Sequence, residues 1–256
     1  MEGDAALLAA LPGWAFAFVL VLCRVGAVVM LMPGLGEVEP PAVVRAGLAL
    51  AVTLLLLPVV APLVSAPPDA GLSGAGASGA GMVAAELLVG AMLGWLARLP
   101  ALALGMAGAI ASYMLGLSSV VQTDPALGRL FGLMAPVLVL STGLYALPLQ
   151  ALGSSYDVFP PGTLLPAGPL ADSVTAAVAA SFGLAVRLAA PFLLAGLVWQ
   201  AALGLLARLA PQLQAYTAAM PGQILGGLAL LALLGSRILA AWLDGVSAAW
   251  MSLPGM

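Results

Sequence analysis

The sequence has 256 residues, of which 63% are hydrophobic and only 7% are charged. A soluble domain carries about 25% charged residues, so this composition excludes a water-soluble globular protein and indicates an integral membrane protein. The net charge of −3 suggests no nucleic-acid partner. Histidine and lysine are both absent, which excludes histidine bases, histidine metal ligands, Schiff-base lysines and the lysine of nucleotide-binding loops.

Six apolar blocks are long enough to cross a hydrocarbon core of about 30 Å as helices. The sequence therefore predicts an all-α polytopic membrane protein with spans near residues 7–32, 46–64, 82–118, 130–152, 174–209 and 222–251. An acidic stretch without a basic residue precedes the first block, unlike in a secretory signal, so we expect this block to be retained. Its Cys23 has no second cysteine and no activating histidine in the chain, so we interpret it as a core residue.

The breaks between the blocks carry turn residues. Residues 33–45 combine prolines and glycines with the charged Glu37 and Arg45, which is typical either of a stiff turn or of a loop that docks on another subunit. Residues 65–81 are rich in Pro, Gly and Ser, and residues 153–173 contain clustered prolines. We expect both to be flexible loops within a single membrane domain that covers residues 1–256.

Two blocks are too long for one simple crossing. Residues 82–118 would extend about 55 Å as a single helix, and residues 174–209 nearly as far. Each block contains a proline with an arginine close by: Pro100 with Arg98, and Pro191 with Arg187. Because proline frees backbone groups that neighbouring protein must satisfy, we expect kinked or hairpin-like helices sheltered in an assembly, with long tilted spans as the alternative.

Four arginines lie inside apolar blocks: Arg24, Arg98, Arg187 and Arg237. Each would cost about 2.5–3.5 kcal/mol at the centre of a lipid-exposed helix. We therefore expect them to face protein, water or headgroups, with Glu86 as a candidate partner and Asp244 as the candidate partner of Arg237. Snorkelling towards the interface is the alternative.

The other arginines indicate orientation. Arg45, Arg129 and Arg208 lie beside alternate breaks, whereas the N-terminal tail and the loops at 65–81 and 153–173 contain no basic residue. Positive charge is enriched on the cytoplasmic side of membrane proteins, so this pattern places the N-terminus outside.

Three Gly-x-x-x-Gly pairs predict positions where helix backbones approach closely. They are Gly90 with Gly94, Gly128 with Gly132, and Gly222 with Gly226. Together they favour a chain that packs against other helices over one surrounded by lipid.

Four segments carry a family pattern in a fixed order. They are MPGLGE at 32–37 with PP at 40–41 and VRAGLAL at 44–50, ELLVG at 86–90, GLS at 116–118 with TDP at 123–125, and APQL at 210–213 with MP at 220–221. In these segments the chain resembles the R subunit of the flagellar and type III secretion export gate, the FliR family. The four segments span most of the chain, and overall similarity favours the flagellar over the virulence branch.

The resemblance implies a non-enzymatic subunit without a cofactor, located in the bacterial inner membrane within the flagellar basal body. It implies that the chain joins the gate's P and Q subunits and the neighbouring switch-type membrane subunit, in contact with membrane lipid. Unfolded flagellar proteins would pass through this gate during flagellum biogenesis.

The resemblance also implies a plug in the export channel. The plug residues would be Gly116, Leu117, Ser118, Ser119, Val120 and Val121, with Asp124 and Pro125 closing the loop. Small, movable apolar residues suit a gate that stops ions yet yields to a passing chain. Without the resemblance, the same segment is better interpreted as a polar loop between two spans. The predicted subunit-contact or buried charges are Glu37, Arg45, Glu86, Arg98 and Arg187.

Three other functions fit parts of the sequence. A secondary transporter of a small anionic solute would use broken helices and an arginine such as Arg98 or Arg187, but no inverted repeat is visible. An intramembrane enzyme would depend on aspartates such as Asp124 or Asp157, for which no matching motif is present. A lipid-embedded scaffold would differ from a gate in one respect, because its removal would spare export.

Overall fold

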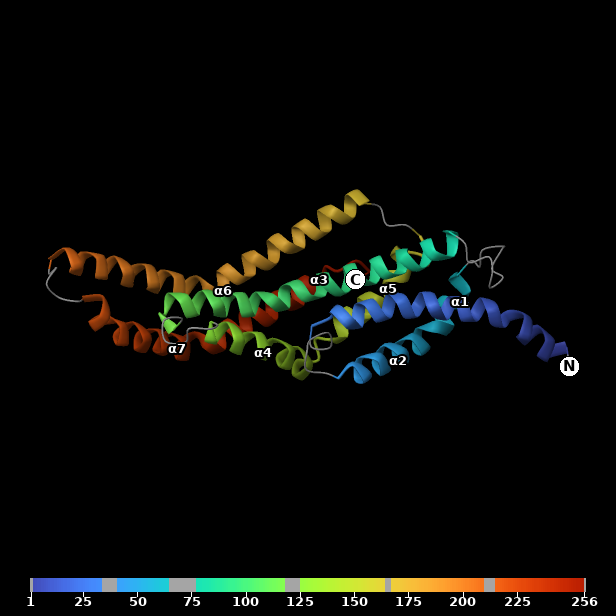
Figure 1. The fold of residues 1–256 in the computed structure, drawn as a ribbon, viewed down its shortest axis with the longest axis horizontal. Coiled ribbons are helices and arrows are strands. Elements are labelled where there is room, and N and C mark those ends of the chain that lie inside the picture. The colour runs from blue at the N-terminus through green and yellow to red at the C-terminus, as the bar shows by residue number, and fades with distance from the viewer. Residues whose placement is uncertain are drawn as a thin grey trace. The chain divides into compact units, whose positions relative to one another are not determined.

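The computed structural model describes residues 2–33, 41–64, 77–117, 125–163, 167–209 and 215–255. Every regular element within these residues is helical (Figure 1). The elements are α1 (Glu2–Leu31), α2 (Ala42–Val60), the 3-10 turn η1 (Ala61–Leu63), α3 (Ala77–Met114), α4 (Ala126–Thr142), α5 (Ala146–Val158), α6 (Ala167–Leu209) and α7 (Ala215–Met251). Five helices are long and apolar enough to cross a membrane, and the bent pair α4–α5 makes a sixth candidate. The predicted fold class is confirmed.

The chain divides into two compact units. Unit 1 comprises Met1–Arg98, Gly143–Thr175 and Trp250–Met256, and unit 2 comprises Leu99–Thr142 and Ala176–Ala249. A single membrane domain over residues 1–256 therefore stays a prediction.

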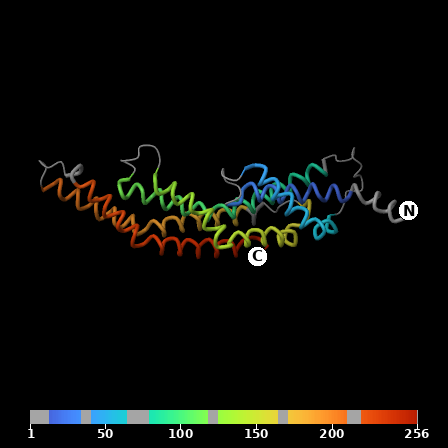
Figure 2. The backbone as a smooth tube through the Cα atoms, turned by 90° about the horizontal axis from the view of Figure 1, so that it is seen from below, coloured from blue at the N-terminus to red at the C-terminus, as the bar shows by residue number. Residues whose placement is uncertain are grey.

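In unit 1, α2 runs beside α1, as both views show (Figures 1 and 2). The core face of α1 is a helical stripe with spacings of three and four residues, and its members are fully buried: Val21, Val25, Val28 and Val29. The facing part of α3 buries Ala85, Val89 and Leu93. This packing excludes water from the C-terminal half of α1.

The glycine pair of α3 brings the backbones of α1 and α3 together. A Cβ atom added at Gly90 would collide with the carbonyl oxygen of Arg24, and one at Gly94 would lie 3.0 Å from the carbonyl oxygen of Val28. The predicted close approach is confirmed here. In unit 2, Gly128 lies against Ala109 of α3, whereas a Cβ at Gly226 would meet nothing within 4 Å.

The fourth apolar block, predicted as a span at 130–152, is not one straight helix. It consists of α4 and α5, separated by a sharp break, and this bent pair is the sixth candidate span. Gly143 lies at the break with a φ of 76°, a left-handed conformation that suits glycine and ends α4.

The two predicted flexible loops differ from the structure in extent. Residues 153–158 belong to α5 and residues 167–173 to α6, so the helices extend into the expected loop at 153–173. Prolines at 160 and 161 follow the end of α5, while Pro169 lies in the first turn of α6, where its missing N–H is not needed. Of the loop predicted at 65–81, residues 77–81 begin α3 and residues 65–76 lie outside the described residues.

The two long blocks are continuous helices of 38 and 43 residues rather than helical hairpins. Figure 1 shows α6 changing direction midway along its length, which accords with its internal Pro191. Carbonyls around Pro100 of α3 accept hydrogen bonds from side chains. In unit 2, Ser181 Oγ donates to the Leu99 oxygen at 2.6 Å and Trp242 Nε1 to the Pro100 oxygen at 3.1 Å. Neighbouring side chains therefore bind the backbone around Pro100. The carbonyl that this proline frees is that of Leu96, four residues earlier, and its satisfaction by neighbouring protein stays a prediction.

Candidate functional site

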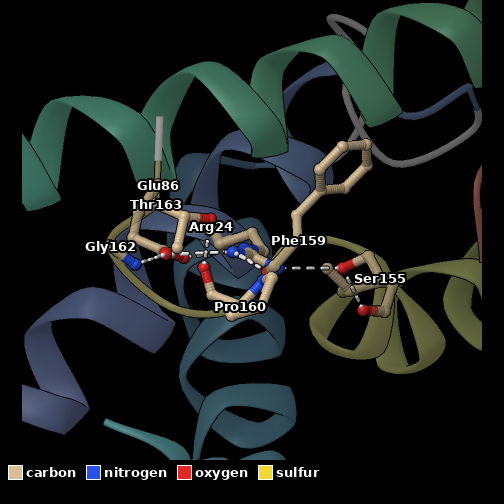
Figure 3. A network of polar contacts seen from close by, with 8 residues as sticks. Arg24, Glu86, Ser155, Phe159, Pro160, Gly162 and Thr163 are labelled. Atoms are coloured by element: carbon tan, nitrogen blue, oxygen red, sulfur yellow. Dashed lines mark hydrogen bonds and ion pairs between the residues drawn. The ribbon is translucent and has the colours of Figure 1, made fainter. Parts of the chain in front are cut away.

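A buried ion pair joins the C-terminal half of α1 to α3 in unit 1 (Figure 3). Arg24 Nε donates to Glu86 Oε2 at 2.7 Å, and Arg24 Nη2 donates to Glu86 Oε1 at 2.9 Å. The side chains are 0% and 1% exposed. This two-bond geometry matches the fork of the guanidinium to both carboxylate oxygens and compensates part of the cost of burying two charges.

Helix α5 and the turn after it supply the other hydrogen-bond partners of Arg24 and Glu86. Arg24 Nη1 donates to Ser155 Oγ at 3.2 Å, and Arg24 Nη2 also donates to the Phe159 carbonyl at 2.9 Å. The backbone N–H of Gly162 donates to Glu86 Oε1 at 2.8 Å, and the Tyr156 ring centroid lies 4.0 Å from Arg24 Cζ. We name this set the Arg24 network. It connects α1, α3, α5 and the turn after α5 through hydrogen bonds, and its role is structural.

The turn in the Arg24 network has its own local cause. Gly162 has a φ of 76°, which favours glycine, and this conformation presents its N–H to Glu86. Thr163 Oγ1 donates to the Pro160 carbonyl at 2.7 Å and closes the turn. A Cβ atom at Gly162 would also collide with the side chain of Met82.

The base of the predicted plug lies in unit 2, at the end of α3. Gly116 has a φ of 71°, and its N–H donates to the Tyr113 carbonyl at 3.2 Å. A left-handed glycine just after a helix is a common way to end it. Ser112 Oγ accepts the backbone N–H of Leu127 at 2.9 Å, so the last turn of α3 is tied to the first turn of α4. Both ends of the segment predicted to form the plug are thereby held close together.

The chain matches the model of the family "Bacterial export proteins, family 1" over residues 15–249. It belongs to this family. It is also 37% identical over 234 residues to the flagellar biosynthetic protein FliR of Caulobacter vibrioides, covering 88% of this chain and 90% of that protein. The membership indicated by the four sequence segments is confirmed.

Only part of the plug expected for this export family falls on described residues. Gly116 and Leu117 follow α3, and Pro125 precedes α4, where its carbonyl accepts the N–H of Arg129 at 3.0 Å. The other predicted plug residues lie outside the described part of the chain: Ser118, Ser119, Val120, Val121 and Asp124. The plug itself stays a prediction.

The predicted charges of this export-family chain have different environments. Glu86 is buried and paired with Arg24, while Arg98 is half-buried and Arg187 is exposed. Arg45 is half-buried, and its Nε atom is buried without a hydrogen-bond partner among the described residues. Glu37 lies outside those residues.

The expected pair of Arg237 with Asp244 is wrong. Both side chains are exposed on α7, and no ion pair joins them. Seven residues along a helix correspond to a rise of about 10.5 Å, so only fully extended side chains could meet across this distance, and both side chains here are exposed to the surroundings instead. One heptad places two side chains on the same face but not in contact.

Sequence reasoning missed Ser155, Tyr156 and Gly162 as partners of the buried pair. All three lie within residues 153–173, which the sequence predicts to be a flexible loop because of their clustered prolines. The signal was the polar run SSYD at 154–157 after an apolar block, in a chain with few polar residues. Among the residues that the structure describes, no group of three potential metal ligands occurs.

Proposed function

We infer that the chain is a membrane subunit of the flagellar type III protein export gate, in the bacterial inner membrane within the flagellar basal body. The identity of 37% to the Caulobacter flagellar biosynthetic protein FliR, over 90% of that protein, carries this inference. The family match over residues 15–249 and the long apolar helices support it. As a gate subunit, the chain contributes part of the channel through which unfolded flagellar proteins are secreted.

The distribution of burial supports an assembly with other subunits. In the most apolar window of α3, 61% of the residues are buried within the chain, compared with 28% for α6 and 11% for α7. Exposed arginines lie on helices that also carry exposed leucines: Arg187 on the same helix as Leu194 in α6, and Arg237 on the same helix as Leu233 in α7. Lipid contact at these arginines would be costly. The proposed partners of these faces are the P and Q subunits and the neighbouring switch-type subunit, with lipid at the periphery.

A secondary transporter of a small anionic solute is not favoured, because the chain belongs to an export family and matches a flagellar protein along nearly its whole length. The buried arginine of unit 1 is also unsuited to bind a solute. Arg24 is 0% exposed, and its guanidinium already binds Glu86, Ser155 and the Phe159 carbonyl.

We further propose that Gly116, Leu117, Ser118, Ser119, Val120 and Val121 form the plug of the channel, with Asp124 and Pro125 closing its loop. The left-handed Gly116 supports this, because it redirects the chain directly after α3. The Ser112–Leu127 hydrogen bond supports it as well, since it holds the two ends of the segment together. A loop fixed at both ends can be displaced by a passing polypeptide and return.

Removal of the chain tests the proposed function. A strain with an in-frame deletion should secrete no flagellar hook or filament protein, and a plasmid copy should restore secretion. Secretion is measured by immunoblotting of the culture medium, with the cytoplasmic level of the same proteins as the control for synthesis. Undiminished secretion from the deletion strain would contradict the gate and favour the lipid-embedded scaffold.

The same complemented strain tests the plug. A plasmid copy in which residues 116–121 are replaced by a Gly/Ser run of equal length should restore the assembled gate but raise passive ion leakage across the membrane, because the apolar obstruction is gone. Leakage is measured as the loss of membrane potential reported by a voltage-sensitive dye. Unchanged membrane tightness in a correctly assembled gate would count against the plug.

A further inference from the structure

Helix α2 of unit 1 has the length and composition of a helix that faces lipid. Its apolar segment, Ala42–Leu63, contains 22 residues and extends about 33 Å, close to a hydrocarbon core of about 30 Å. Only 17% of the residues in its most apolar part are buried within the chain, and residues 46–63 contain no charge. The corresponding segments of α3, α6 and α7 contain 33 to 39 residues and are longer than the core is thick. The exposed side of α2 therefore fits acyl chains without placing a charge among them.

Arg45 lies in the first turn of this helix and lacks a counter-charge there. Its side chain is half-buried, and its Nε atom is buried without a hydrogen-bond partner. No ion pair joins it to another described residue, and the first turn of α2 contains no acidic residue. The start of a helix is the positive end of its dipole, so the helix does not stabilise this cation either. Arg45 therefore needs an anion that the described residues do not supply.

Apolar side chains continue from Arg45 along one side of α2. They follow at spacings of three and four residues, which keeps them on one helical stripe: Arg45, Leu48, Val52, Leu55 and Val59. We name this set the Arg45 stripe; Leu55 is 75% exposed and Val59 is 67% exposed. Side chains on a helix tilt towards its N-terminus, so the guanidinium points to the end of α2 and away from the leucines. The rise from Arg45 to Leu55 is about 15 Å, which is half the hydrocarbon core and hence one leaflet.

We propose that the Arg45 stripe binds one anionic phospholipid, with the phosphate on Arg45 and an acyl chain along Leu48, Val52 and Leu55. A cation followed by an apolar stripe one leaflet long complements a molecule in which a negative charge is followed by a hydrocarbon chain. The arginine pattern of the sequence places Arg45 on the cytoplasmic side, where anionic lipids are enriched. A carboxylate of a neighbouring subunit would satisfy Arg45 but would leave the apolar part of the stripe unexplained. This inference rests on the membrane location of the chain and not on the proposed gate function.

Lipid binding by the purified full-length chain tests the phosphate contact. The chain in mild detergent is titrated with dioleoyl phosphatidylglycerol, and native mass spectrometry measures the fraction that retains the lipid. Arg45→Gln should weaken this binding about tenfold, the shift expected for loss of a hydrogen bond to a charged group. Arg45→Lys keeps a cation for the phosphate and should retain most of the affinity. Arg237→Gln, at an exposed position of α7, is the matched control and should leave binding unchanged.

A second variant tests the acyl-chain contact. Leu55→Ala shortens the stripe at a position that is 75% exposed, so the fold should be preserved. It should weaken phosphatidylglycerol binding about fourfold, the value for loss of one buried methylene group. Leu233→Ala on α7 is the matched control, because Leu233 is 74% exposed and lies outside the stripe. Glycerol phosphate supplies the phosphate without acyl chains and should bind far more weakly than phosphatidylglycerol.

The outcomes separate a lipid from other anions. Equal binding of phosphatidylglycerol by the wild type and Arg45→Gln overturns the inference, also where Arg45→Gln lowers the yield of a complex with neighbouring membrane proteins, since Arg45 then binds a subunit. Glycerol phosphate that binds as tightly as phosphatidylglycerol would show a site for a free anion and overturns it as well. Should Arg45→Gln fail to fold, Leu55→Ala decides, and wild-type lipid binding by this variant contradicts the stripe. None of these measurements depends on export, so failure of the proposed gate function would leave them unchanged.

Discussion

Replacing Glu86 with leucine should lower the free energy of unfolding by about 3–5 kcal/mol, the range for loss of one partner of a buried ion pair. The size follows from the environment of Arg24, which is 0% exposed and would keep its charge without a counter-charge. The N–H of Gly162 would lose its acceptor as well, since it now donates to Glu86 Oε1. The measurement is chemical or thermal unfolding of the purified chain in mild detergent.

A double variant refines this prediction. Arg24→Met combined with Glu86→Leu removes both charges, and it should be less destabilised than Glu86→Leu alone, because no uncompensated charge stays buried. Asp244→Asn is the matched control, since this carboxylate is exposed and makes no ion pair among the described residues. Wild-type stability in Glu86→Leu would show that the Arg24 network does not hold unit 1 together.

Substitution of Gly90 by alanine should have the next largest effect on stability, about 1–3 kcal/mol of destabilisation, the usual cost of overpacking a core. The added methyl group would collide with the carbonyl oxygen of Arg24, and it would also lie 2.9 Å from Cβ of Ala27. A backbone atom cannot rotate away as a side chain can. The two helices must therefore separate, which also displaces the guanidinium that Arg24 presents to Glu86.

Gly26→Ala is the control for this substitution. Gly26 lies on α1, and an added Cβ there would meet nothing within 4 Å. Because alanine favours a helix over glycine by roughly 0.5–1 kcal/mol, Gly26→Ala should be neutral or slightly stabilising. Equal effects at the two glycines, measured by unfolding in the same detergent, would contradict the close approach of α1 and α3.

The membrane class and most of the helices could be predicted from sequence, because the apolar blocks are long and few other structures bury so many apolar residues in succession. The fourth block shows the limit. Its apolar run continues through residues 143–145, so nothing in the composition marks the sharp bend, and only the left-handed Gly143 explains it. The extent of α5 differs for the opposite reason: prolines at 160 and 161 predict a loop, but they follow the end of a helix that continues to Val158.

The candidate site was predicted only in part. The cost of an arginine in an apolar helix indicated that Arg24 needs a partner, and Glu86 was a candidate for that role. Which of the four arginines pairs with Glu86 depends on which helices pack together. Residue spacing along the chain does not give this tertiary information. The same limitation explains the wrong pair of Arg237 with Asp244, because a shared helix face does not imply contact.

We propose that the apolar, arginine-bearing faces of α6 and α7 contact other subunits of an export gate. To test this, the chain is expressed with its neighbouring membrane proteins and purified in mild detergent, and the mass of the product is measured by native mass spectrometry. A complex of fixed stoichiometry that contains the P and Q subunits is expected. A stable, monodisperse chain surrounded only by detergent and lipid, recovered in the presence of those proteins, would contradict it.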